Sequence, residues 1–162
     1  MWNCVLSALM ERTLNDEFDR EDSQDVVDWL YFEKARAELG PGFIRILGYY
    51  REDGEKSVAK IERAMHEHDA VALVIPAHTL KGESRQFGAE PLADIAEKIE
   101  IVARSCIETH RFPDELVPDV VELRRMFDLT VELFDKATNP LKTRASGGGF
   151  GRKVANQEFG RI

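Results

Sequence analysis

Apolar residues recur at three- and four-residue spacing along most of the chain, which is the pattern of amphipathic α-helices. No stretch shows convincing strand-like alternation of apolar and polar residues. The stripes predict helices over about residues 26–39, 41–68, 69–87, 91–102 and 116–134. Short turns rich in glycine and proline separate these segments. Four long amphipathic helices joined by short turns predict an all-α fold, an antiparallel four-helix bundle with one or two accessory N-terminal helices on its side.

The two ends of the chain differ in composition from this central region. Residues 1–24 begin with an apolar stripe at helical spacing and continue as a polar stretch, so they form either an accessory helix or a poorly ordered leader. Ser23 or Asp25 is expected to cap the first bundle helix. Residues 140–162 are basic and contain the glycine-rich stretch ASGGGFGRK, which predicts a flexible tail. The folded domain is therefore expected to span residues 25–139.

Charge and cysteine content restrict the classes of partner. The chain of 162 residues has a net charge of −8, and the basic tail leaves the remaining body more acidic still. Such a body argues against nucleic-acid binding, which draws on lysine and arginine facing phosphates. No run reaches the ~20 apolar residues of a membrane span, and the N-terminus lacks the features of a signal peptide. With only two cysteines and no disulfide framework, a cytoplasmic setting is expected. A monomer is expected because one bundle can bury the apolar stripes internally.

The stretch His78-Thr79-Leu80-Lys81-Gly82 lies inside the predicted helix 69–87. At about 100° per residue, Lys81 falls about 60° to one side of His78 and Gly82 about 40° to the other. Glycine costs roughly 1 kcal/mol against alanine in a helix interior, so its presence here requires a reason. Apolar residues occupy both the core side of this helix and the histidine side, which is unusual for a simple surface helix.

Reversible phosphorylation of His78 accounts for these residues. Neutral imidazole is nucleophilic at neutral pH, and Lys81 would stabilise the charge of the incoming phosphoryl oxygens, with Arg85 as a second cation. Gly82 would leave room for the active site of a partner to approach the histidine closely. The docking surface for that partner is expected to include Val71, Val74, Ile75, Arg85 and Gln86.

Other interpretations of these residues remain open at this stage. His78 can be an ordinary surface histidine, and the same bundle can bind and regulate a kinase or receiver domain without carrying phosphate. A helical enzyme with its own nucleotide site is the weakest alternative, because the chain shows no Walker loop. No metal site is expected, because the other histidines lack ligand spacing. No carboxylate cluster is expected around His78 either.

The stretch AHTLKGESRQFGAEPLADIAEKIE resembles the signature of histidine-containing phosphotransfer (HPt) domains, the phosphoryl carriers of multistep two-component relays. A looser similarity extends from about Val26 through the last helix. The resemblance implies a helical bundle without kinase activity or a cofactor of its own, in which His78 is the phosphoryl acceptor. Lys81 and Gly82 match the charge-stabilising lysine and the close-approach glycine of the family. The implied partners are response-regulator receiver domains, which would supply Mg²⁺, and hybrid sensor histidine kinases.

Two residues depart from the pattern of the family. The family often has a small residue at the position of Glu83, and a half-buried carboxylate there would need a partner such as Arg63 or a lysine of another helix. Pro76 removes a backbone donor two residues before His78, so either the helix is kinked or its regular part begins there. Neither departure affects the His78, Lys81 and Gly82 core of the motif.

Overall fold

The computed structural model describes residues 26–139, and all regular structure in this part of the chain is helical. In order, its elements are α2 (Trp29–Leu39), η1 (Gly40–Gly42), α3 (Phe43–His66), α4 (Ala70–Gln86), α5 (Glu90–Glu108), η2 (Asp114–Leu116) and α6 (Val117–Thr138). The predicted leader, residues 1–24, and the predicted tail, residues 140–162, lie outside the described residues. The prediction of an all-α bundle is confirmed.

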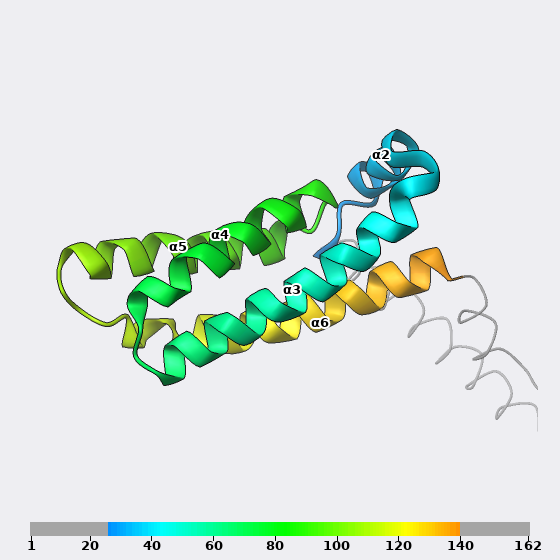
Figure 1. Cartoon of the computed structure of the whole chain (residues 1–162). Coiled ribbons are helices and arrows are strands. Elements are labelled where there is room, and N and C mark those ends of the chain that lie inside the picture. Colours follow the sequence, from blue (N-terminus) through cyan, green and yellow to red (C-terminus); the bar gives the residue numbers. More distant parts are fainter. Residues whose placement is uncertain (1–25, 140–162) are drawn as a thin grey trace, which may run out of the picture.

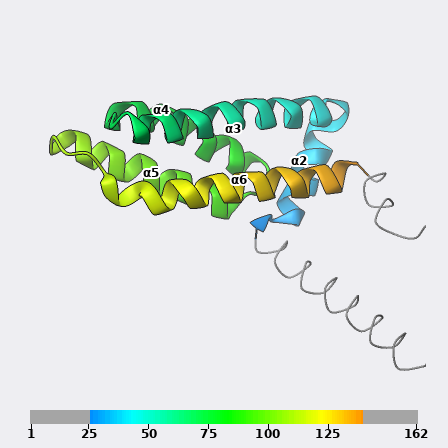
Figure 2. The ribbon, with the colours of Figure 1, turned by 90° about the horizontal axis from the view of Figure 1, so that it is seen from below.

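Helices α3 to α6 form the bundle, and each packs against two neighbours in the cyclic order α3, α4, α5, α6 (Figure 1). Interhelical pairs between residues distant in sequence show that neighbouring helices run antiparallel, as in Tyr50 with Ser84 and Arg51 with Asp135. Helix α2 lies at one end of the bundle, where it contacts α3 (Figure 2). This up-and-down arrangement places α4 between α3 and α5, so the predicted motif has a neighbouring helix on each flank.

Two aspartates begin the helices that position the motif. The side chain of Asp69 accepts hydrogen bonds from the backbone N–H groups of Val71 and Ala72, both at 3.0 Å, and so caps α4. Asp28 caps α2 by accepting from the N–H of Tyr31 at 3.0 Å. The expected cap at Ser23 or Asp25 is therefore wrong, because α2 begins only after an extended residue at Asp28.

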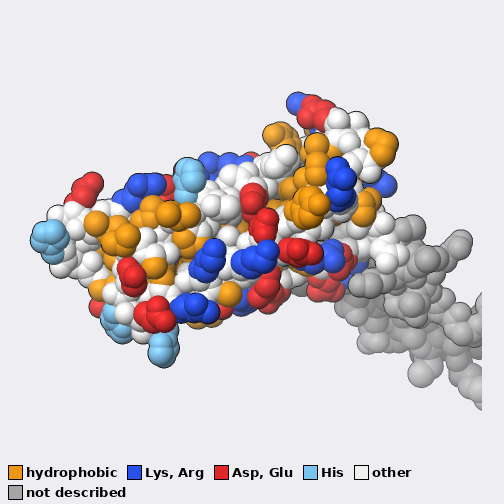
Figure 3. Space-filling model, viewed as in Figure 1, with side chains coloured by type: hydrophobic (Ala, Val, Ile, Leu, Met, Phe, Trp, Pro, Cys, Tyr) orange, Lys and Arg blue, Asp and Glu red, His pale blue; other side chains and the backbone are white. Residues whose placement is uncertain are grey.

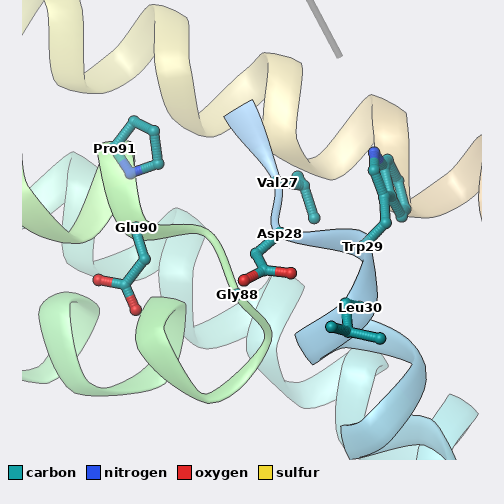
Figure 4. Close-up of a pocket in the computed structure, with 7 residues that line it drawn as sticks. All are labelled: Val27, Asp28, Trp29, Leu30, Gly88, Glu90 and Pro91. Atoms are coloured by element: carbon teal, nitrogen blue, oxygen red, sulfur yellow. The ribbon is translucent and has the colours of Figure 1, made fainter. Parts of the chain in front are cut away.

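The turn between α4 and α5 is tied to the segment that precedes α2. Gly88 has φ +77°, and a Cβ at this position would lie 2.7 Å from the carbonyl oxygen of Asp28. The N–H of Asp28 donates to the carbonyl of Gly88 at 2.8 Å, and Figure 4 shows the two residues side by side. Only glycine fits both the left-handed backbone and this close approach, which explains why α4 ends here.

Aromatic side chains fill the part of the core next to α2. Phe32 stacks on Phe134 with ring centroids 4.8 Å apart, and the Tyr50 hydroxyl lies 3.2 Å from that of Ser84. Burial raises the pKa of the Tyr50 phenol. A Cβ at Gly54 would lie 2.5 Å from the Phe127 ring, so this glycine lets α3 and α6 approach each other closely. Helices α3 and α6 thus pack on each other, and α4 and α5 pack against them.

None of the helices within residues 26–139 combines the length and the apolar composition that a membrane span requires.

Candidate functional site

His78 lies in the middle of α4, and its side chain is 64% exposed. The opposite side of the helix is anchored in the core by Leu73, Ala77 and Leu80, which are fully buried. Pro76 lies inside α4 and is buried as well. The helix already begins at Ala70, so the suggestion that its regular part starts at Pro76 is wrong. The core residues hold the backbone of α4 in place while the histidine faces outward.

Glu100 of α5 holds one nitrogen of the His78 ring. Nδ1 of His78 lies 3.1 Å from Oε1 of Glu100, whose side chain is only 7% exposed. This carboxylate was not singled out from the sequence as a partner of His78. Sequence reasoning missed it because Glu100 is distant in the sequence and comes close only through the antiparallel packing of α4 on α5.

Glu100 is ionised over the whole physiological range. Burial raises the pKa of its carboxyl, but hydrogen bonds from Lys81, Arg104 and His78 outweigh that effect and lower the pKa to about 2. An ionised carboxylate only accepts hydrogen bonds. Nδ1 of His78 must therefore carry the proton that it donates, and Nε2 of a neutral ring keeps its lone pair.

Lys81 approaches the same carboxylate from the next turn of α4. Its ammonium donates to Oε2 of Glu100 at 2.8 Å and to Oε1 of Glu97 at 3.5 Å. The hydrogen bond to Glu100 raises the pKa of Lys81. Since His78 and Lys81 bind the two oxygens of one carboxylate, the lysine cation is held beside the imidazole, where the sequence predicted it.

Arg104 completes the set of donors around Glu100. It stands one turn later on α5, and its Nε and Nη2 lie 3.1 Å and 2.9 Å from Oε1. Sequence reasoning did not single out this arginine. The available signal was the spacing of Glu100 and Arg104, which is that of a helical ion pair. This spacing is common on solvated helices and gives no indication that the pair faces His78.

The predicted docking residues do not all share one environment. Val71 and Ile75 are 65% and 76% exposed, and they lie on the His78 side of α4, about two turns and one turn before it, respectively. Val74 is partly buried and packs against the core. Figure 3 shows apolar side chains gathered on the face of α3 and α4, with basic side chains beside them. The free apolar surface beside the histidine is thus provided by Val71 and Ile75.

Arg85 and Gln86 lie at the C-terminal end of α4. The Arg85 guanidinium is engaged with three carboxylates of α5, at 3.4 Å from Glu90, 3.4 Å from Asp94 and 2.9 Å from Glu97. The side chain of Gln86 is exposed. Arg85 therefore links α4 to α5 in this structure, and it reaches His78 only indirectly, through Glu97, Lys81 and Glu100.

Gly82 is exposed, and a Cβ built at this position meets no other atom within 4 Å. Packing within the described residues therefore does not require a glycine here, in contrast to Gly54. The bare backbone of Gly82 leaves the surface next to His78 open. This is the geometry expected if the glycine serves the approach of a second molecule.

Glu83 does not have the partner that the sequence suggested. Its Oε2 is buried and has no hydrogen-bond partner among the described residues, so neither Arg63 nor a lysine supplies one. Burial and the nearby charge of Asp53 both raise the pKa of Glu83. Within residues 26–139, no group of three or more histidine, cysteine or acidic side chains has a geometry that could hold a metal ion.

Comparisons with known proteins agree with this architecture. A family model described as the Hpt domain matches residues 45–131, a span that runs from α3 into α6 and contains His78. The fold is similar to the crystal structure of histidine-containing phosphotransfer protein B (HptB) from Pseudomonas aeruginosa PAO1. The TM-score is 0.62 at 23% sequence identity, and the match covers 71% of this chain and 96% of that one.

No curated protein shows significant sequence similarity to the chain. At 23% identity the crystal structure supports the fold, and the assignment to a family comes from the family model. That model spans more than half of the chain. The chain therefore belongs to the Hpt domain family, the histidine phosphotransfer domains of two-component phosphorelays.

Proposed function

We propose that His78 accepts and donates the phosphoryl group through Nε2. The observation that carries this assignment is the contact between Nδ1 and the buried, ionised Glu100, at 3.1 Å in an otherwise exposed side chain. A ring held through Nδ1 has a fixed orientation and presents Nε2 as the nucleophile. The role of Glu100 is to hold the imidazole and its tautomer, as the carboxylate of a catalytic triad does.

The transfer requires little other chemistry from this chain. The lone pair of Nε2 attacks the phosphorus of an aspartyl phosphate, the bond from phosphorus to the aspartate oxygen breaks, and the aspartate leaves as a carboxylate. The imidazole gains positive charge as the new bond forms, and its Nδ1–H then donates more strongly to Glu100. Lys81 stabilises the negative oxygens of the phosphoryl group. Transfer onward to a second aspartate reverses these steps.

The partner that docks here is a receiver domain or a hybrid sensor histidine kinase. Members of the Hpt family interact with receiver domains and histidine kinases. The exposed Val71 and Ile75 form the apolar part of the docking surface on this chain, with Gln86 at its edge and Arg85 bridging to α5. Gly82 provides clearance for the reacting aspartate. Mg²⁺ belongs to the acidic pocket of the receiver. Action as a cytoplasmic monomer stays a prediction.

Phosphoryl transfer to the purified chain tests this assignment. Radiolabelled receiver domains and hybrid kinases serve as donors, and the wild type is compared with His78→Gln. We expect an acid-labile, base-stable label on the wild type and none on the variant. Circular dichroism of the variant shows whether it is folded. A wild type that binds receivers but takes no label from any of them would contradict the proposal.

A further inference from the structure

A hollow of about 390 Å³ opens between α3 and α4, on the flank of His78 that faces away from Glu100. Helix α3 contributes polar residues to its wall, and α4 contributes the exposed Ile75 and the unpaired Glu83. Asp53, Lys56 and Lys60 of α3 and Thr79 of α4 also line it.

Glu83 is the unsatisfied group of this hollow. A buried carboxylate oxygen without a donor is costly, because water has been removed from it and nothing has replaced the lost hydrogen bonds. The other charges nearby do not correct this. Lys56 donates to Asp53 at 2.9 Å, so these two residues satisfy each other. Glu83 therefore has an acceptor without a donor, and the same residue lines the hollow.

The hollow adjoins the surface that a partner must cover during transfer. Around the axis of α4, Gly82 lies about 40° from His78, Thr79 about 100° and Glu83 about 140°, all on the same side. Gly82 has no side chain, and Thr79 already lines the hollow. A receiver seated over Gly82 thus has a short path to Glu83, and Ile75 continues the apolar docking surface to the rim.

The charges of the lining residues restrict what can enter. Asp53 pairs with Lys56, and Lys60 adds a second cation to the lining, so that the formal charges of the lining residues, Glu83 included, sum to zero. A charged side chain entering this balanced space would lose hydration without full compensation. A neutral amide does not have this problem, because its NH₂ can donate to Glu83 and its carbonyl can accept from Lys60.

Building on the proposed phosphotransfer function, we propose that the hollow between α3 and α4 is the specificity pocket of the docking surface. It takes an asparagine or glutamine side chain from the receiver domain, and that amide supplies the hydrogen bond that Glu83 lacks. Receivers without an amide at the matching position dock more weakly.

Transfer kinetics with the receiver that labels the wild type fastest test this pocket. Glu83→Ser removes the acceptor, and Glu108→Gln on the exposed end of α5 is the matched control for the lost charge. We expect Glu83→Ser to raise the KM for the phosphorylated receiver about tenfold, the effect of a lost hydrogen bond to a charged group. Glu108→Gln should keep the wild-type KM. Labelling of His78 by phosphoramidate, which needs no docking, reports whether each variant is folded and reactive.

A double-mutant cycle then identifies the amide. Each asparagine or glutamine around the phosphorylated aspartate of the receiver is changed to leucine and combined with Glu83→Ser. One receiver variant should raise KM by a similar factor and add nothing when it is combined with Glu83→Ser. An unchanged KM for Glu83→Ser, or strict additivity with every receiver variant, would overturn the pocket alone. A wild type that takes no label from any receiver would overturn the proposed function and the pocket together.

Discussion

The two sides of α4, one facing α5 and the other facing α3, surround a carboxylate with opposite environments. On the α5 flank, Glu100 accepts hydrogen bonds from His78, Lys81 and Arg104, and its pKa falls to about 2. On the α3 flank, Glu83 has a buried oxygen with no partner, and its pKa is raised by burial and by Asp53. The folded chain therefore stabilises the ionised form of Glu100 and destabilises the ionised form of Glu83.

This difference assigns the chemistry of His78 to the α5 flank and the recognition of a partner to the α3 flank. The reactive histidine is held by groups of this chain alone, which suits a carrier that must present the same nucleophile to donor and acceptor. The α3 flank lacks a donor that a second molecule can bring. Gly82 lies between the two flanks, and its lack of a side chain leaves the surface between them open.

The largest effect is expected from closing the space between the flanks. Gly82→Leu should slow transfer from a phosphorylated receiver by about a hundredfold or more, because small displacements of reacting groups have effects of this size. The fold should not suffer, since a Cβ at Gly82 meets no atom within 4 Å. Gly82→Ala should raise the free energy of unfolding by about 1 kcal/mol through helix propensity. Stopped-flow transfer and urea unfolding measure the two quantities, and wild-type transfer by Gly82→Leu would contradict this role.

Removing the Glu100 carboxylate, on the α5 flank, should have an intermediate effect on the transfer rate. Glu100→Gln removes the anion that holds His78 and Lys81, and transfer should slow roughly ten- to a hundredfold, as expected for hydrogen bonds to a charged group. The contribution of Glu100 to the free energy of unfolding should also depend on pH. Because the pKa of Glu100 is lowered from 4.5 to about 2, its stabilisation is complete above pH 4.5 and is lost as the pH falls toward 2.

Urea unfolding over a pH series tests this dependence. The wild type should be more stable than Glu100→Gln at neutral pH, and the two unfolding free energies should converge as the pH falls from 4.5 toward 2. A difference that stays constant over this range would show that the carboxylate charge is not what stabilises the fold. Glu108→Gln serves again as the control for a change in net charge.

The smallest effect is expected for Glu83 on the α3 flank, where the substitution should raise stability and not lower it. Glu83→Gln removes an ionisable group that the folded state disfavours as an anion, so stability at neutral pH should rise by about 1 kcal/mol. Because the folded pKa of Glu83 is raised, the wild type should lose stability relative to the variant as the pH rises above 4.5. The same pH series measures this difference. A variant that is less stable than the wild type at neutral pH would show that Glu83 has a partner in solution.

Local sequence patterns determined much of this protein. The apolar periodicity placed the bundle helices, Asp69 and Gly88 marked the ends of α4, and the motif placed His78, Lys81 and Gly82 on one side of that helix. Each of these inferences depends on residues within a few turns of one another, where helix geometry converts spacing directly into position. The first helix was predicted to start too early because its cap, Asp28, follows two buried valines that continue the apolar pattern.

Only the tertiary structure decided which groups surround the histidine. Glu100 and Arg104 reach His78 because α5 packs antiparallel on α4, and the rotation of one helix against the other is set by side-chain packing over the whole interface. The same packing leaves Glu83 beside the hollow between α3 and α4, without the arginine or lysine partner that the sequence suggested. Sequence spacing specifies the face of one helix, whereas the partners of that face depend on how every helix of the bundle fills the core.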